Sequence, residues 1–429
     1  MDNSIPLKKV RAEIAKCMKC GNCMAVCPIY KATKAEAGVA RGKIQLAAAL
    51  LEGRLPFTHG VEERLMTCLT CKACSANCPC GVKADEIILA ARAAVAGKLG
   101  LPLIKTTAFS VLKRPLLFDW GLKLGSRFQG IFLKDNGQGN RSPRFPLGLD
   151  TKRVLPVLAG VTFRDAFVPV SLANPRLKVA FFTGCVTNYI YTEVGKATVE
   201  VLRANNIEVI VPEEQHCCGA PVRIHGDVAT AEEMARSHVD SFAKLQVDAI
   251  ITVCGTCGET FQHSYPELLV NDRVYGPKAG KIAGITHDIS EFLVNVVKIN
   301  SAALSGVNLK VTYHDPCHLV RGMGVSREPR EILRAIPGVS LTELKNPARC
   351  CGGAGSFSLT HYGLSMDIHR HKADDIRASG AEVVVTGCGS CRMQLEDGLR
   401  QHGTPRKVMH TIEVLALAYA GQKAGDVPA

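Results

Sequence analysis

The chain has 429 residues, more than one hydrophobic core of ordinary size can hold, so we expect two to four domains. Hydrophobic residues make up 47% of the chain and charged residues 21%, as in an ordinary globular protein. The formal net charge of +13 comes with only 5% aromatic residues and no nucleic-acid recognition motif, so we expect no nucleic-acid partner.

The cellular compartment follows from segments that the sequence lacks. No apolar signal segment precedes the first cysteine, and no apolar run reaches the length of a membrane span, so we expect a cytoplasmic protein. In a reducing compartment, the nineteen cysteines indicate metal or redox chemistry and not disulfide bonds.

Two cysteine runs near the N-terminus, CMKCGNCMAVCP and CLTCKACSANCPC, match the C-x2-C-x2-C-x3-C-P pattern of two-cluster ferredoxins. In this pattern three closely spaced thiolates hold one cube, and the fourth reaches the other cluster. One cubane 4Fe–4S cluster is therefore assigned to Cys17, Cys20, Cys23 and Cys78. The second is assigned to Cys68, Cys71, Cys74 and Cys27. Zinc sites use pairs of cysteines instead of such triplets.

Helices are expected around these runs. The alanine-rich segments 36–55 and 84–99 predict helices, so residues 1–97 should form a mostly helical two-cluster ferredoxin domain. Cys80 lies outside the pattern, and we expect it to be a structural thiol.

Residues 98–174 contain no cysteine and form a basic connector, with twelve lysines or arginines against four aspartates. Its segment 112–136, LKRPLLFDWGLKLGSRFQGIFLKDN, alternates basic residues with Leu, Phe and Ile at helical spacing and holds the only tryptophan, Trp120. Such a stretch can pack on the ferredoxin domain, lie on an anionic membrane surface or dock an acidic partner. The sequence leaves these alternatives open.

The other ten cysteines form an internal repeat. A single cysteine, an adjacent pair and a C-x2-C motif follow one another with gaps of 31 and 35 residues in the first copy and 32 and 36 in the second. The first set is Cys185, Cys217, Cys218, Cys254 and Cys257. The second set is Cys317, Cys350, Cys351, Cys388 and Cys391. We expect repeated domains at 175–305 and 306–429.

The segments LKVAFFTGC, LKVTYHDPC, DAIITVCGTC and AEVVVTGCGSC each predict an apolar strand that ends at a cysteine, with helical stretches between them. This alternation predicts parallel βαβ units, whose strands bring their carboxyl ends to one edge where ligands bind. The expected fold class is α+β and multidomain: the helical ferredoxin domain followed by two repeated α/β domains with parallel sheets.

Five thiolates per copy exceed the four that a cubane or a tetrahedral zinc ion needs. Neighbouring thiolates such as Cys217 and Cys218 can bind different metal ions, and one sulfur can bridge two of them. The surplus favours an irregular iron–sulfur cluster in each copy, while zinc with a spare thiol remains an alternative.

Five histidines lie near these motifs or at similar late positions in the two copies. We expect His216, His314 and His318 to form hydrogen bonds around the metal rather than to ligate it. His287 and His410 are expected to pack or to cap helices.

The motifs RGKIQL, CLTCKACSANCP, HCCGAP, HDPCH and CCGGAGSF resemble those of the CCG-domain iron–sulfur proteins, which include heterodisulfide reductase subunits. Within this family the chain is most similar to the iron–sulfur subunit of glycolate oxidase and D-lactate dehydrogenase, over most of its length. The resemblance implies non-cubane 4Fe–4S clusters at both sets of five cysteines, although some relatives carry zinc at one of them.

The resemblance also implies a partner and a function. In the family this subunit accompanies an FAD-containing dehydrogenase subunit that oxidises a 2-hydroxy acid, and no flavin or nicotinamide motif is evident here. We therefore expect an oxidoreductase subunit that passes electrons from that flavoprotein to quinone or another carrier, with peripheral contact to the inner face of a membrane as an option. The alternative is a catalytic subunit that reduces a disulfide at a non-cubane cluster. A zinc-stabilised scaffold would leave the ferredoxin runs unexplained.

Overall fold

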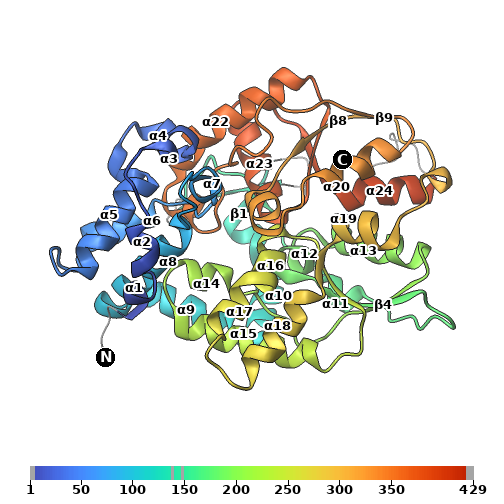
Figure 1. Cartoon of the computed structure of the whole chain (residues 1–429). Helices are drawn as coiled ribbons and strands as arrows, with labels where there is room; N and C mark the ends of the chain where they lie inside the picture. Colours follow the sequence, from blue (N-terminus) through green and yellow to red (C-terminus); the bar gives the residue numbers. More distant parts are fainter. Residues whose placement is uncertain (1–4, 137–139, 146–148, 422–429) are drawn as a thin grey trace.

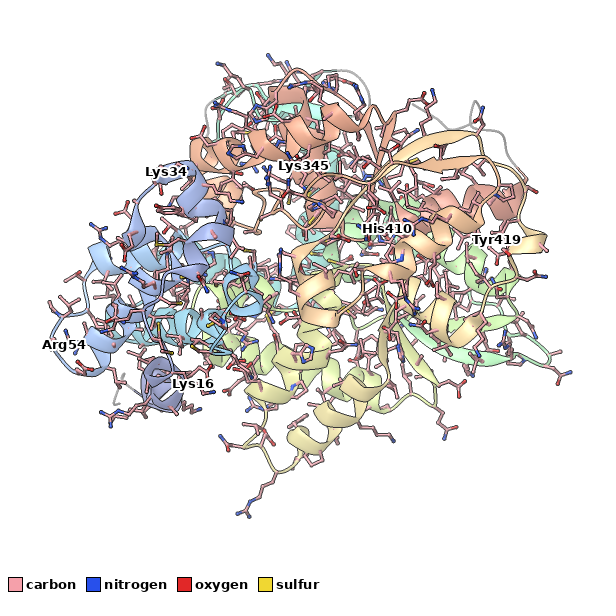
Figure 2. All side chains as sticks on the ribbon, turned by 45° about the horizontal axis from the view of Figure 1, so that its top comes forward. Lys16, Lys34, Arg54, Lys345, His410 and Tyr419 are labelled. Carbon is pink, nitrogen blue, oxygen red and sulfur yellow. The ribbon has the colours of Figure 1, made fainter. Side chains whose placement is uncertain are left out.

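The computed structural model describes residues 5–136, 140–145 and 149–421. Residues 5–99 are helical and contain no strand, as predicted (Figure 1, blue). The helices are α1 (Ile5–Lys9), α2 (Arg11–Ala15), α3 (Asn22–Val26), α4 (Pro28–Thr33), the 3-10 helix η1 (Glu36–Gly38), α5 (Ala40–Leu51), α6 (His59–Met66), α7 (Ala73–Ala76) and α8 (Ala84–Leu99). They enclose a core of Leu7, Ile44, Leu65 and Ile87, while Lys34 and Arg54 are exposed on the outer surface (Figure 2).

The connector packs on both repeats: Phe118 lies against Tyr189 of the first, and Arg153 donates to the Ser358 carbonyl oxygen of the second at 2.6 Å. Its elements are α9 (Leu103–Leu112), α10 (Pro115–Phe132), β1 (Leu133–Asp135), β2 (Asn140–Pro143), β3 (Leu155–Pro156) and α11 (Phe163–Ala166). The three strands form a small antiparallel sheet. The ring of Phe118 on α10 packs edge-on against Tyr189, with ring centroids 5.4 Å apart.

The first repeat is built on a parallel sheet of order β5-β4-β6-β7. Its strands are β4 (Leu177–Phe182), β5 (Ile207–Ile210), β6 (Ala249–Thr252) and β7 (Thr286–Asp288). Ala180 at the centre of the sheet pairs with Ile210 on one side and Ile250 on the other. The helices are α12 (Gly184–Tyr189), α13 (Thr192–Ala204), α14 (Ala220–Ile224), α15 (Val228–Ala243), α16 (Gly255–Glu259), the π-helix η2 (Thr260–Ser264), α17 (Tyr265–Leu268), α18 (Tyr275–Gly284), α19 (Ile289–Glu291), the π-helix η3 (Phe292–Val297) and the 3-10 helix η4 (Ser301–Ala303).

The second repeat has the same strand arrangement, β9-β8-β10-β11, and is again parallel. Its strands are β8 (Leu309–His314), β9 (Val339–Leu341), β10 (Val383–Thr386) and β11 (Lys407–His410). Its helices are the π-helix η5 (Leu319–Met323), α20 (Arg327–Ala335), α21 (Phe357–Thr360), α22 (Tyr362–Ser379), α23 (Gly389–Gln401) and α24 (Thr411–Ala420). The four strands predicted to end at cysteines do so, and the α+β multidomain fold class is confirmed.

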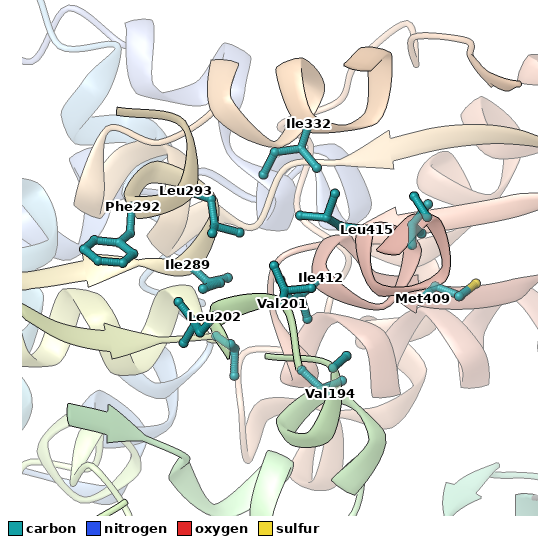
Figure 3. Close-up of a cluster of buried hydrophobic side chains, with 14 of the residues drawn as sticks. Val194, Val201, Leu202, Ile289, Phe292, Leu293, Ile332, Met409, Ile412 and Leu415 are labelled. Atoms are coloured by element: carbon teal, nitrogen blue, oxygen red, sulfur yellow. The ribbon is translucent and has the colours of Figure 1, made fainter. Parts of the chain in front are cut away.

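The two repeats share one hydrophobic core. Val201 and Leu202 of α13 lie in the same buried cluster as Ile412 and Leu415 of α24, and Ile332 of α20 joins them (Figure 3). Burying one such side chain contributes about 1.5–3 kcal/mol, so this cluster holds the two sheets in a fixed relation. The predicted domain limits at 97, 174 and 305 remain predictions.

No single helix in the described part of the chain is long and apolar enough to cross a membrane. The helices α8 and α9 reach that length only together, across a bend of 115°.

The close packing of α11 on α13 gives a test of this arrangement. A Cβ added at Gly195 would lie 2.5 Å from the buried ring of Phe163. We expect Gly195→Ala to cost about 1–3 kcal/mol through overpacking and to lower the melting temperature by several degrees. In the matched control Gly280→Ala, also within a helix, the new Cβ meets no atom within 4 Å. That variant should be unchanged or slightly more stable. Equal melting temperatures of the two variants in anaerobic calorimetry would contradict this packing.

Candidate metal centres

The cysteines assigned to the first cubane line one small cavity in the helical part. It is bordered by Cys17, Cys20, Cys23, Cys74, Cys78 and Cys80. The first three lie between α2 and the first turn of α3, and Cys78 follows α7. The structure therefore brings together all four residues of the predicted set, although they are separated by up to 61 positions in the chain. Ligation itself stays a prediction.

The cysteines assigned to the second cubane line a neighbouring cavity. It is bordered by Cys27, Cys68, Cys71 and Cys74. Cys74 and Ala40 border both cavities, so the two sites are adjacent. The crossing of the fourth cysteine from each run to the other site, which the spacing predicted, agrees with this placement.

Two buried cations lie within electrostatic reach of cysteines of the second site. The ammonium group of Lys43 is fully buried and donates to the Gly38 carbonyl oxygen. The guanidinium of Arg92 donates to the carbonyl oxygens of Leu65 and Cys68, at 2.8 and 2.6 Å from Nη2. These positive charges offset part of the negative charge that thiolates would bring.

As thiolates, these buried cysteines would need a compensating positive charge. Burial and the neighbouring Cys68 raise the pKa of Cys74 to about 12, and burial also raises the pKa of Cys27. A metal ion supplies the positive charge that lets such thiols bind as thiolates, so the donor set fits an iron–sulfur cluster.

The first repeat brings its five cysteines to the carboxyl edge of its sheet. Cys185 lies at the start of α12, the adjacent pair precedes α14, and Cys254 and Cys257 lie at the start of α16. The pair is followed by Gly219 in the left-handed conformation, at φ 86°, which turns the chain directly after the two thiols.

The second repeat has the same arrangement. Cys317 follows β8, and Cys388 and Cys391 lie at the start of α23. The adjacent pair is followed by Gly352 at φ 91°, equivalent to Gly219. The backbone amide of Gly352 donates to Cys350 Sγ at 3.4 Å, which stabilises a thiolate there. All nineteen cysteines are free of disulfide bonds, and eight of the ten in the repeats are buried.

The ten thiols of the repeats form one continuous series of neighbours. Each thiol shifts the pKa of the next in the order Cys185, Cys217, Cys218, Cys257, Cys254, Cys388, Cys391, Cys351, Cys350 and Cys317. The two repeats meet where Cys254 Sγ lies 3.5 Å from Cys388 Sγ. Hydrogen bonds from its neighbours lower the pKa of Cys218 well below its usual value, while those of Cys217 raise its pKa.

The second repeat also meets the ferredoxin part. Cys71 and Cys350 belong to one buried cluster, and half-buried Cys27 and Cys317 pack against it. Arg321 reinforces this junction by donating to the carbonyl oxygen of Cys71 at 3.1 Å and to that of Ala348 at 2.7 Å. The four cysteine groups therefore follow one another through space, from the first cubane set to the second, then to the second repeat, and last to the first repeat.

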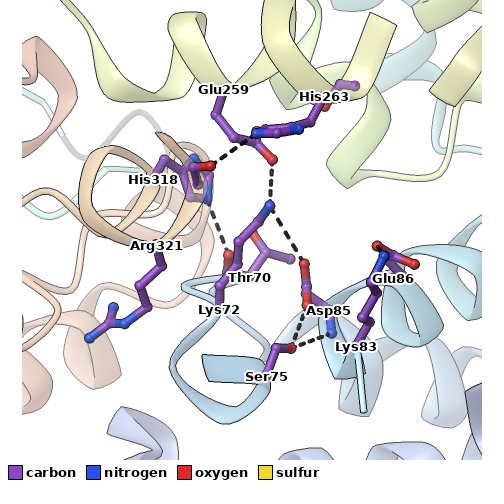
Figure 4. A network of polar contacts seen from close by, with 12 residues as sticks. Thr70, Lys72, Ser75, Lys83, Asp85, Glu86, Glu259, His263, His318 and Arg321 are labelled. Carbon is purple, nitrogen blue, oxygen red and sulfur yellow. Dashed lines mark hydrogen bonds and ion pairs between the residues drawn. The ribbon is translucent and has the colours of Figure 1, made fainter. Parts of the chain in front are cut away.

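A polar cavity of about 250 Å³ lies at the junction of the three parts (Figure 4). It reaches the loops next to the cysteines: Thr70, Ala220, Thr260 and His318 are among its lining residues. The ion pair between Lys72 Nζ and Glu259 Oε1, at 2.5 Å, crosses it. Burial alone would raise the pKa of Glu259, but the facing His318 and Lys72 hold it below its usual value.

Sequence reasoning missed this cavity. Lys72 and Glu259 are 187 residues apart, and only their positions beside cysteine motifs gave any signal. The remaining cations, Arg223 and Arg321, lie on separate elements.

The histidines fall into different roles. His410 caps α24 in a capping box, as predicted, whereas His287 contacts Glu291 and the cap of α19 is Asp288. His216 forms hydrogen bonds through both ring nitrogens, to the Cys217 carbonyl and Ser237, as expected of a residue around the metal.

His314 differs from His216. It is buried, neither ring nitrogen has a hydrogen-bond partner, and its ligand atom lies within 4.8 Å of those of Cys351 and Cys391. This orphaned imidazole fits a group held by the second repeat, whether it donates to a cluster sulfur or ligates iron.

Comparison with known proteins agrees with this arrangement. Residues 179–262 and 311–396 each match the family described as cysteine-rich domain (CCG), and residues 13–82 match the 4Fe-4S dicluster domain. The chain is 30% identical to the probable glycolate oxidase iron-sulfur subunit of Bacillus subtilis, covering 99% of this chain and 98% of that one. It is 31% identical to a fumarate reductase (CoM/CoB) subunit of Methanothermobacter marburgensis, over 96% of this chain and 73% of that one.

One further relative by sequence and one solved structure of similar fold extend the comparison. Lactate utilization protein A of Halalkalibacterium halodurans is 34% identical over 56% of this chain and 96% of its own. The crystal structure of a hypothetical protein from Helicobacter pylori has the same fold, with a TM-score of 0.53 at 9% identity, covering 98% of this chain and 77% of that one.

The cysteine placement and these relatives together define an iron–sulfur oxidoreductase subunit with an electron-transfer role. The chain belongs to the family of iron–sulfur proteins that join a 4Fe-4S dicluster domain to two cysteine-rich CCG domains.

Proposed function

We propose that this chain is the iron–sulfur subunit of a flavin-dependent D-lactate or glycolate dehydrogenase. It takes electrons from a partner FAD-containing dehydrogenase subunit and passes them through 4Fe–4S clusters to quinone or another carrier. The observation that carries the proposal is the unbroken spatial succession of four cysteine groups. Such a succession serves electron transfer, because clusters held by neighbouring groups lie close enough to exchange electrons.

The proposed ligand sets are those of the sequence analysis. Two cubanes are held by Cys17, Cys20, Cys23 and Cys78, and by Cys68, Cys71, Cys74 and Cys27. Two non-cubane clusters are held by Cys185, Cys217, Cys218, Cys254 and Cys257, and by Cys317, Cys350, Cys351, Cys388 and Cys391. The clusters, when bound, supply reversible one-electron chemistry.

The chain's own residues prepare these sites. Burial excludes water from most of the repeat thiols, and backbone amides such as those of Thr70 and Gly352 donate to cysteine sulfur at 3.4 Å. Arg321 fixes the loop of Cys71 against the second repeat, so the spacing between these two sites depends on it. The oxidation of the hydroxy acid is assigned to the partner subunit.

A second function is favoured by the polar cavity. Reduction of a disulfide at a non-cubane cluster requires an open site beside that cluster, and the 250 Å³ cavity reaches Ala220, next to the first repeat's cysteine pair, and His318, next to Cys317. Its charged lining consists of the cations Lys72, Arg223 and Arg321 and the carboxylates of Asp85, Glu86, Glu259 and Glu267.

Metal analysis tests the cofactor content. Anaerobically purified chain should contain about sixteen irons and an equal amount of acid-labile sulfide, because four clusters hold four irons each. Stepwise reduction followed by EPR should show more than two cluster signals. About eight irons with zinc in the repeats would contradict the non-cubane clusters and leave only the two cubanes.

Exchange of cysteines tests the crossing of the fourth ligands. Cys78→Ser should alter the signal of the cluster held by Cys17, Cys20 and Cys23, because it removes that cluster's fourth thiolate, and should lower the iron content by up to about four. Cys80→Ser is the matched control: Cys80 borders the same cavity two positions away and should leave iron content and EPR unchanged. If Cys78→Ser altered the Cys68–Cys71–Cys74 cluster instead, the crossed assignment would be wrong.

Assays of the isolated chain separate the two functions. With a reduced viologen as electron donor, the purified chain should not turn over small disulfides, but it should accept electrons from the flavoprotein subunit and D-lactate or glycolate. Steady disulfide reduction that falls at least tenfold in Arg223→Gln, with EPR unchanged, would instead establish the catalytic alternative.

A further inference from the structure

Helix α10 turns an apolar face toward solvent. Leu116 is 86% exposed, Trp120 62% and Ile131 60%, values expected of polar surface residues. Further exposed apolar residues on the same helix are Leu117, Leu124, Phe128 and Phe132. The spacing 116, 120, 124, 128 and 131 follows the helical repeat, so these side chains form a stripe along one face that covers about 23 Å of the helix.

The orientation of the helix is fixed by its other face. Phe118 is buried against Tyr189, and Lys123 bridges Asp119 and Asp165 at 2.8 Å each. The side chain of Gln129 donates to the carbonyl oxygen of Leu158 at 2.9 Å and accepts from its amide at 3.0 Å. The apolar stripe therefore faces solvent, because the opposite face of α10 already packs on the protein and forms these ion pairs and hydrogen bonds.

The exposed apolar side chains of the chain are concentrated between residues 103 and 145. Ten of the twenty exposed large apolar side chains in the described part of the chain lie between residues 103 and 145, including Leu103 and Ile104 of α9. Single exposed apolar residues are ordinary, but a contiguous group marks an interaction surface.

Basic side chains accompany the stripe. Arg114, Arg127 and Lys134 are exposed, and none of them is in an ion pair among the described residues. The one acidic residue within α10, Asp119, forms an ion pair with Lys123 on the inner side. The outward face thus combines apolar side chains with unpaired positive charge.

We propose that α10 lies on an anionic membrane surface, with Leu116, Trp120 and Ile131 at the boundary of head groups and acyl chains. A narrow apolar row with flanking basic residues and an aromatic residue at mid-helix matches an interfacial helix. The basic side chains complement acidic head groups, which is the charge relation that selects lipid over a neutral protein surface. If the proposed function holds, this contact brings the clusters near a lipid-soluble acceptor.

Trp120 provides the readout, because it is the only tryptophan of the chain. The full holoprotein is mixed with phosphatidylcholine vesicles that contain or lack phosphatidylglycerol. With the anionic vesicles we expect a blue shift of Trp120 emission and co-flotation of the protein, both weakened by high salt. Neutral vesicles should bind much less.

Variants locate the contact. Leu116→Glu and Ile131→Glu should reduce co-flotation at least tenfold, since a carboxylate would enter the apolar boundary. Val274→Glu, a matched change at a 59% exposed valine of the first repeat, should bind like the unchanged protein. Iron content and EPR signals should be the same in all of these proteins, so failure of this proposal is distinct from failure of the electron-transfer function.

Two outcomes would overturn the proposal. Emission unchanged by both kinds of vesicle would remove the lipid contact. A shift of Trp120 emission on addition of the dehydrogenase subunit, with no response to vesicles, would identify the stripe as a subunit interface instead.

Discussion

Thiolates that lie side by side in a protein interior repel one another, and burial removes the water that would otherwise screen them. The two repeats nevertheless collect ten cysteines in one continuous series, and the ferredoxin part adds nine more around two adjacent cavities. The neighbouring thiols oppose one another's ionisation: interactions with Cys185 and Cys218 raise the pKa of Cys217, while the pKa of Cys218 is lowered. A cluster bound here would replace thiol protons with iron, so metal uptake would stabilise this region.

The scaffold makes this concentration of sulfur possible by joining elements from the whole chain. The parallel sheets deliver each cysteine group at a strand's carboxyl end, and the shared core of α13 and α24 keeps the two edges face to face. As a direct consequence, Cys254 of the first sheet edge lies against Cys388 of the second. Arg92 and Arg321 extend the same arrangement to the ferredoxin part, since Arg92 bonds to both Leu65 and Ile224, and Arg321 to Cys71.

Much of this could be predicted from local sequence. The apolar strands end at their cysteines because strand and turn signals lie within ten residues of each other, and the cysteine spacing of the ferredoxin runs specified which thiols share a cavity. Relations between distant segments could not be predicted. Nothing in the sequence indicated that Cys71 would meet the second repeat rather than the first, or that Lys72 would pair with Glu259, because these contacts depend on how finished domains pack. The outward face of α10 was equally undetermined, since amphipathic spacing alone does not say which face is covered.

The two repeats differ in the residues that lie near their cysteines. On the strand that precedes the first cysteine, the second copy has His314 where the first has Phe182. On the helix that follows the cysteine pair, the second copy has Lys372 where the first has His238. Lys372 is fully buried and donates to the Asn346 and Pro347 carbonyls, while His238 lies in an aromatic group with Phe182. Burial lowers the pKa of Lys372 to about 8, which still leaves it mostly charged at neutral pH. An added electron makes a cluster more negative, so a nearby cation favours the reduced form. The two repeats therefore place different charges around the same cysteine motif, and Lys372 gives the second repeat a buried cation at a position where the first repeat has His238.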